Sequence, residues 1–141
     1  MRSVFIHLTD ININELTIYL NSTYPEQNNP WLILKNEDPV LYINHYTNTL
    51  AEYDFEKEEI ESIKKALNGD ITASLIIDVS GRHEGLDEVT LFLEKILTRF
   101  KGIAIDEYTQ HPWSLEEIKE KKEIQDHPFF DYKGWSIGTL K

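Results

Sequence analysis

The sequence of 141 residues contains no cysteine, which excludes disulfide bonds, a thiol nucleophile and any metal site built on thiolates. It also lacks a run of about 20 apolar residues, so no segment is expected to cross a membrane. Glycines and prolines are few and form neither a linker nor a low-complexity tract. We therefore expect one globular domain spanning residues 1–141.

The N-terminal segment lacks the features of a secretion signal. It carries one positive charge, and His7 and Asp10 interrupt its short apolar run. Since the chain also has no cysteine with which to exploit an oxidising compartment, we expect a cytoplasmic protein.

Basic residues are scarce, because 14 lysines and arginines face 25 aspartates and glutamates, giving a formal net charge of −11. A field of this sign repels phosphate backbones and anionic lipids, so we expect neither nucleic acid nor a membrane surface as a partner. Lys119, Lys121 and Lys122 are interleaved with glutamates and form no basic patch. The same field would accelerate encounter with a basic protein.

Apolar periodicity predicts strands that alternate with helices in the order β-α-β-β-α-β-α-β-α. Asn12-x-x-Glu15 and Ser114-x-x-Glu117 have the form of capping boxes that begin two of the helices. The last helix is expected to end at His127-Pro128. The predicted strands are 3–8, 31–34, 40–46, 75–79 and 102–105, and the other two helices follow Asp54 and cover 86–100.

Residues 74–106 carry the clearest pattern, an apolar strand, an amphipathic helix and a second short apolar strand. This pattern predicts a β-α-β unit with parallel strands. We therefore expect an α+β fold: a mixed β-sheet with a C-terminal parallel β-α-β unit and helices packed mainly on one face. A doubly wound α/β sheet is the alternative.

Polar residues follow both strands of this unit, at the edge where open sheets usually place ligands. One hypothesis makes His83 a general base, or His83, Asp106 and His111 the ligands of a metal in a small metal-dependent enzyme. The spacing matches no metal-ligand motif, and loop 80–85 lacks the pattern of a phosphate-binding loop.

We therefore expect these polar residues to be structural, with Arg82 paired to Glu84 or Asp106 and the loop glycines permitting a tight strand-to-helix turn. No catalytic residue, metal or cofactor is predicted. Asp106 and Glu107 are adjacent on a strand and should point to opposite faces, so they cannot act together on one atom.

Several short motifs in the second half resemble those of small bacterial immunity proteins, which are encoded beside polymorphic or contact-dependent growth inhibition toxins. The resemblance covers about residues 73–137. It implies a cytoplasmic protein that binds its cognate toxin domain and blocks it, with no chemistry of its own. The matching stretches are Ser80-Gly81-Arg82 with Gly85, the segment 100–109, Trp113-x-Leu115-x-Glu117-Ile118, and Phe129-Phe130-Asp131-Tyr132-x-Gly134-Trp135.

Many toxin domains are nucleases with a basic substrate groove, which an acidic inhibitor can reach quickly and occupy. We expect the contacts in two sets, of which the second is preferred because loops on a rigid scaffold often carry recognition. Trp113 is a candidate aromatic anchor from a C-terminal region rich in aromatic residues. The first set is Glu56, Glu58, Glu59 and Glu61 on a helix, and the second is Glu84, Asp106 and Glu107 with the neighbouring Arg82 and His83.

A second hypothesis is an accessory or subunit protein in which the C-terminal aromatic residues are buried in an interface. Simple packing of these aromatic residues in the core is the other reading. The sequence does not fix the oligomeric state.

Overall fold

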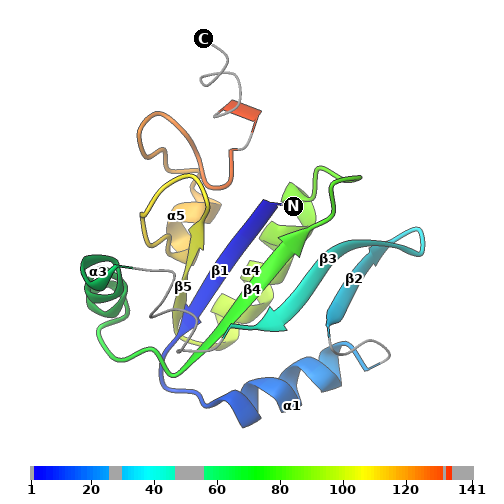
Figure 1. The fold of residues 1–141 in the computed structure, drawn as a ribbon, viewed down its shortest axis with the longest axis horizontal. Helices are drawn as coiled ribbons and strands as arrows, with labels where there is room; N and C mark the ends of the chain where they lie inside the picture. The colour runs from blue at the N-terminus through cyan, green and yellow to red at the C-terminus, as the bar shows by residue number, and fades with distance from the viewer. Residues whose placement is uncertain (1, 26–29, 47–55, 132, 135–141) are drawn as a thin grey trace.

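A computed structural model describes residues 2–25, 30–46, 56–131 and 133–134. Strands and helices alternate in the order that the apolar periodicity predicts (Figure 1). The elements are β1 (Arg2–Leu8), α1 (Ile13–Thr23), β2 (Trp31–Lys35), β3 (Asp38–His45), α3 (Lys57–Leu67), β4 (Ala73–Val79), α4 (Leu86–Arg99), β5 (Gly102–Asp106) and α5 (Leu115–Lys119).

The five strands form one sheet in the order β2-β3-β4-β1-β5, and every neighbouring pair is antiparallel. The predictions of a mixed sheet and of a parallel β-α-β unit are therefore wrong, as is the doubly wound alternative. β4 and β5 do run in the same direction, but β1 lies between them and pairs with both. The fold is α+β.

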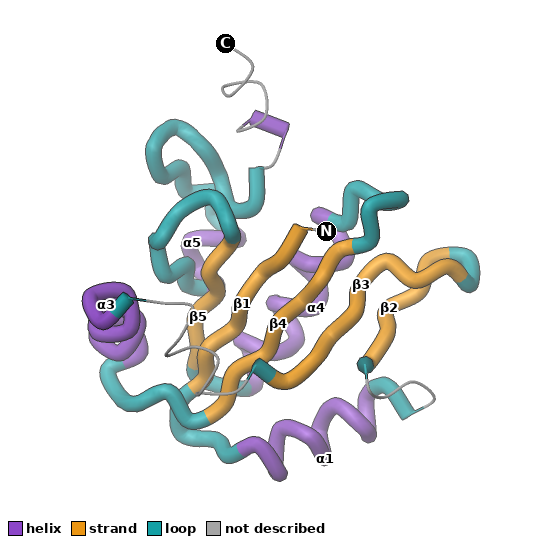
Figure 2. The backbone as a smooth tube through the Cα atoms, viewed as in Figure 1, coloured by secondary structure: helices purple, strands orange, loops and turns teal. Residues whose placement is uncertain are grey.

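The main core lies between the sheet and the helices α1, α4 and α5. β1 places Val4, Ile6 and Leu8 on this side by strict alternation, and all three are fully buried. The wide apolar face of α4 covers them with Val89, Phe92, Leu93 and Ile96. Figure 2 shows α4 passing behind the central strands and α1 running along the end of the sheet.

A smaller apolar cluster lies on the other face of the sheet, under α3. Ile63 and Leu67 are the buried residues of this helix, and they pack with Ile103 and Ile105 of β5. Most of α3 therefore faces water, as its narrow apolar seam predicts. Asp54, the predicted start of this helix, lies outside the described residues.

Both helices begin at the predicted caps, but only the second has the complete capping box. Asn12 accepts a hydrogen bond from the backbone of Glu15, and Ser114 and Glu117 form a complete capping box. The predicted length of the last helix is wrong, because α5 ends at Lys119. Left-handed backbone conformations at Lys121, Gln125 and Asp126 turn the chain repeatedly before Pro128 is reached.

Candidate functional site

The C-terminal ends of β4 and β5 lie at the same end of the sheet, beside the start of β1, as the predicted strand directions require. Arg2 of β1 fixes the loop at 80–85 by donating hydrogen bonds to three of its backbone carbonyls. Gly85 at the end of this loop has a φ of +75°, so a glycine does permit the tight turn into α4. The carbonyls that accept from Arg2 belong to Ser80, His83 and Glu84.

Asp38, the first residue of β3, contacts both Arg82 and His83 at the tip of this loop. His83 Nε2 lies 2.6 Å from Asp38 Oδ2, and the Arg82 guanidinium contacts the other carboxylate oxygen. The prediction that Arg82 pairs with Glu84 or Asp106 is wrong, because the β2–β3 hairpin supplies a closer carboxylate. A contact 44 residues away along the chain leaves no local signal in the sequence.

Glu84 also has a partner within the chain, since its Oε2 lies 3.4 Å from Lys133 Nζ. Arg82, His83 and Glu84 were all predicted as contact residues. In the structure, Arg82 and His83 contact the Asp38 carboxylate and Glu84 pairs with Lys133. A partner protein would therefore have to compete with these contacts.

Asp106 is buried, with 2% of its surface exposed, and the prediction that it is an exposed contact residue is wrong. Its carboxylate accepts hydrogen bonds from the backbone amides of Tyr108 (3.2 Å), Thr109 (3.1 Å) and Phe130 (2.8 Å). An aspartate that closes the turn after a strand in this way is structural.

Trp113 is also buried, at 1% exposure, so it cannot serve as an exposed interface anchor in this conformation. Its backbone pairs with Ala104 through two hydrogen bonds of 2.9 and 2.7 Å and covers the outer edge of β5. Its ring packs edge-on against His111 and Phe129. Phe129 and Phe130 are buried in the core as well, whereas Tyr132 and Trp135 lie outside the described residues.

The residues of the metal hypothesis are not brought together. His83 pairs with Asp38, Asp106 binds backbone amides, and His111 Nε2 lies 3.1 Å from Glu117. No group of three side chains suited to a metal ion occurs in the described part of the chain. The geometry therefore gives the hypothesis of a metal-dependent enzyme no support.

Glu117 is an ionised carboxylate at the start of α5. Burial disfavours its charged form, but hydrogen bonds from the Ser114 backbone, Lys122 and His111 outweigh this effect and lower the pKa to about 2. The capping box and these two side chains explain the role of Glu117 without any reference to a ligand.

The acidic residues of α3 lie in a different environment. Glu56, Glu58 and Glu61 are exposed and Glu59 is partly exposed. Glu107, just after β5, is exposed too, and it lines the same pocket as Glu59. None of these five carboxylates forms a salt bridge within the described residues. We call Glu56, Glu58, Glu59, Glu61 and Glu107 the acidic patch.

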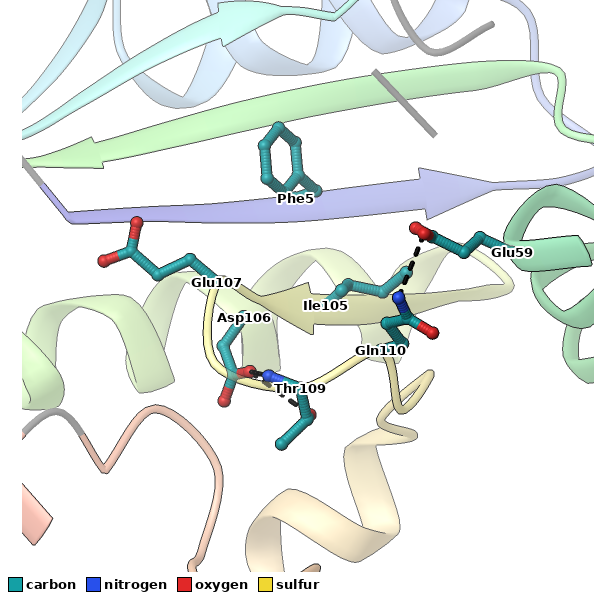
Figure 3. A pocket seen from close by; sticks show the side chains of 7 residues that line it. All are labelled: Phe5, Glu59, Ile105, Asp106, Glu107, Thr109 and Gln110. Atoms are coloured by element: carbon teal, nitrogen blue, oxygen red, sulfur yellow. Dashed lines mark hydrogen bonds between the residues drawn. The ribbon is translucent and has the colours of Figure 1, made fainter. Parts of the chain in front are cut away.

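The pocket beside the acidic patch has a volume of about 160 Å³. Figure 3 shows Glu59 and Glu107 toward opposite ends of it, with Phe5 and Ile105 between them. Gln110 Nε2 donates a hydrogen bond of 3.0 Å to Glu59 Oε1. Asp106 points away from Glu107, as predicted for adjacent residues of a strand (Figure 3).

Sequence reasoning missed Phe5 and Gln110 as parts of this site. Phe5 belongs to a strand whose neighbours are set by long-range pairing, and Gln110 lies in a turn without a recognisable motif. The pattern did hold one signal, because alternation along β1 separates Phe5 from the core residues Val4 and Ile6.

No helix in the described ranges is long and apolar enough to cross a membrane. Comparisons with protein-family models, curated proteins and solved structures found no match to this chain.

Proposed function

We propose that this chain is an immunity protein that binds a cognate bacterial toxin domain in the cytoplasm and neutralises it without catalysis of its own. A basic toxin domain of the nuclease type is the partner that fits best. The net charge of −11 and the resemblance of residues 73–137 to immunity proteins support this proposal.

The acidic patch is the observation that carries the proposal. Its carboxylates lie on α3 and just after β5, and none of them forms a salt bridge with a cation of the described chain, although Lys57, Lys64 and Lys65 lie on the same helix. Carboxylates that form no salt bridge within the chain can steer a partner of opposite sign and pair with its cations without breaking an internal salt bridge. The contact set therefore shifts from the loop at 80–85 toward α3 and Glu107.

An accessory or subunit protein is the second candidate, and an apolar groove beside α4 favours it. The groove has a volume of about 620 Å³ and includes Leu91, which is 59% exposed. Exposed apolar surface of this kind often marks a site of protein association. The other apolar lining residues are Leu86, Ile118, Pro128 and Phe129.

The test is calorimetric binding, at two salt concentrations, to the C-terminal toxin domain encoded immediately upstream, together with rescue of growth. The proposal predicts tight one-to-one binding that weakens as salt rises, and rescue of cells that express the toxin domain. Absence of both binding and rescue would refute the immunity function. Binding that is insensitive to salt and is lost on Leu91→Asp would favour the accessory role.

A further inference from the structure

The pocket between α3 and the turn after β5 differs from the rest of the acidic patch because it is concave and has an apolar floor. Phe5 and Ile105 form this floor, and both belong to the cluster under α3. The Phe5 ring is partly exposed and is held edge-on by Tyr46, with ring centres 5.0 Å apart. The floor is therefore a fixed aromatic surface.

The side chains around the mouth of the pocket present acceptors. Glu59 and Glu107 contribute carboxylates, and Gln110 uses its amide nitrogen to donate to Glu59. No lysine, arginine or histidine is among the described residues that line the pocket. The site is thus suited to a group that brings several donors and a positive charge.

The size of the pocket limits what can enter it. A volume of about 160 Å³ is below the range of roughly 300–1,000 Å³ that is usual for small-molecule sites. It has room for one side chain of a partner, with an apolar stem along the floor and a charged head at the mouth. Among cationic side chains, the planar guanidinium of arginine can stack on an aromatic ring and also donate to more than one carboxylate.

We propose that this pocket is an anchor site for one arginine side chain of a basic protein partner. The guanidinium stacks on Phe5 and donates to Glu59, which Gln110 holds in position, while Glu107 adds negative charge at the other end of the pocket. The inference rests on the proposed function and names the contact at the centre of that interface, where arginine is a frequent source of binding energy.

The first experiment compares matched variants in the complex with the toxin domain encoded upstream. Glu59→Gln with Glu107→Gln removes both pocket charges, and Glu58→Gln with Glu61→Gln removes the same number of charges outside it. The pocket pair should weaken binding by about tenfold or more, mainly through faster dissociation, and the control pair by less than about threefold. Equal losses would overturn the anchor site.

Phe5→Leu supplies an independent variant, because it keeps the apolar floor and removes the aromatic face. It should weaken binding several-fold with little change in thermal stability. Replacing each exposed arginine of the partner by lysine in turn should find one substitution whose effect is not additive with the pocket pair. If every such substitution is additive, the proposal is wrong.

The second experiment does not need the toxin domain. The intact protein is titrated with N-acetyl-arginine methylamide while the backbone amide signals are followed by NMR, and N-acetyl-citrulline methylamide is the neutral control. The arginine compound should shift signals of Ile105, Gln110 and α3 with millimolar affinity, and Glu59→Gln with Glu107→Gln should abolish the shifts. No localised shift at ~100 mM, or equal shifts with citrulline, contradicts the pocket.

The two experiments separate the two claims. A toxin domain that fails to bind, together with a specific arginine response, refutes the immunity function and retains the pocket. A toxin domain that binds and is indifferent to the pocket variants, together with no arginine response, refutes the pocket and retains the function.

Discussion

The loop at 80–85 and the acidic patch both gather charged residues near the edge of one sheet, yet their charges are used differently. In the loop, Arg82 and His83 pair with Asp38, and Glu84 pairs with Lys133. The carboxylates of the patch form no salt bridge with any residue that the structure describes. Salt bridges within the chain fix the loop, whereas the patch carboxylates, which form none, remain available to pair with a partner.

The largest expected effect comes from reversing charge in the patch. Glu58→Lys, Glu59→Lys and Glu107→Lys together should slow association with a basic toxin domain by about 100-fold at low salt, because the steering field at the contact site is lost. Stopped-flow measurement of the association rate at two salt concentrations checks this.

A matched control uses three exposed glutamates of the α5 region, Glu116, Glu120 and Glu123. Reversing these to lysine gives the same change in net charge away from α3, and should slow association by less than about tenfold. If both triple variants behave alike, only the net charge matters and the patch is not the contact site.

A change at the buried carboxylate should affect stability and leave binding alone. Asp106→Asn weakens the hydrogen bonds from the backbone amides of Thr109 and Phe130 and should lower the free energy of unfolding by about 2 kcal/mol. Urea unfolding checks this. Unchanged stability with weakened binding of the toxin domain would return Asp106 to the contact surface.

Glu117→Gln should cost about 1 kcal/mol at neutral pH, because the capping box and the contacts of Lys122 and His111 lose a negative charge. The pKa of Glu117 is lowered by folding, so its stabilising effect is complete above the unfolded value of 4.5 and is lost as the pH falls toward about 2. Urea unfolding of both proteins across this range checks the sign. A difference that grows as the pH falls would contradict it.

The smallest effect is expected in the loop itself. Asp38→Asn removes the anionic partner of Arg82 and His83, and pairs this close to solvent contribute little, so a loss of about 0.5 kcal/mol is expected. Binding to the toxin domain should be unchanged. A loss of binding as large as that caused by the reversed patch would make the loop the contact site after all.

The order and type of the elements could be predicted because each depends on a local pattern. Alternation along β1, the three- and four-residue steps of α4 and the capping boxes at Asn12 and Ser114 all describe neighbours in sequence. The end of α5 at Lys119 could not be predicted, because the charged residues that follow have helix-forming side chains. The turn is made by Lys121, a non-glycine residue in the left-handed conformation, and by backbone hydrogen bonds from Lys121 and Lys122 to the carbonyls of Ile118 and Glu117.

The apolar pattern of the sequence does not show which strands lie side by side in the sheet. The unit at 74–106 does return in the same direction, but the first strand of the chain is inserted between its two strands. A nearly continuous apolar strand is typical of a parallel sheet, but β4 carries the same pattern because most of its residues are buried in an antiparallel sheet.

The sequence predicted that acidic residues form the candidate site, but it identified only some of the residues that do. Glu107 and the α3 glutamates follow from charge and exposure, whereas the burial of Asp106 and Trp113 depends on contacts with Phe130 and Ala104 made after the chain has folded. Pairing of the loop with Asp38 likewise depends on the position of the hairpin.

Hydrogen–deuterium exchange of the protein alone and in complex with the toxin domain encoded upstream tests the central claim most directly. The account predicts slower exchange in α3 and at residues 107–110 on binding, with the loop at 80–85 unchanged. Protection confined to that loop, or to the groove beside α4, would contradict it.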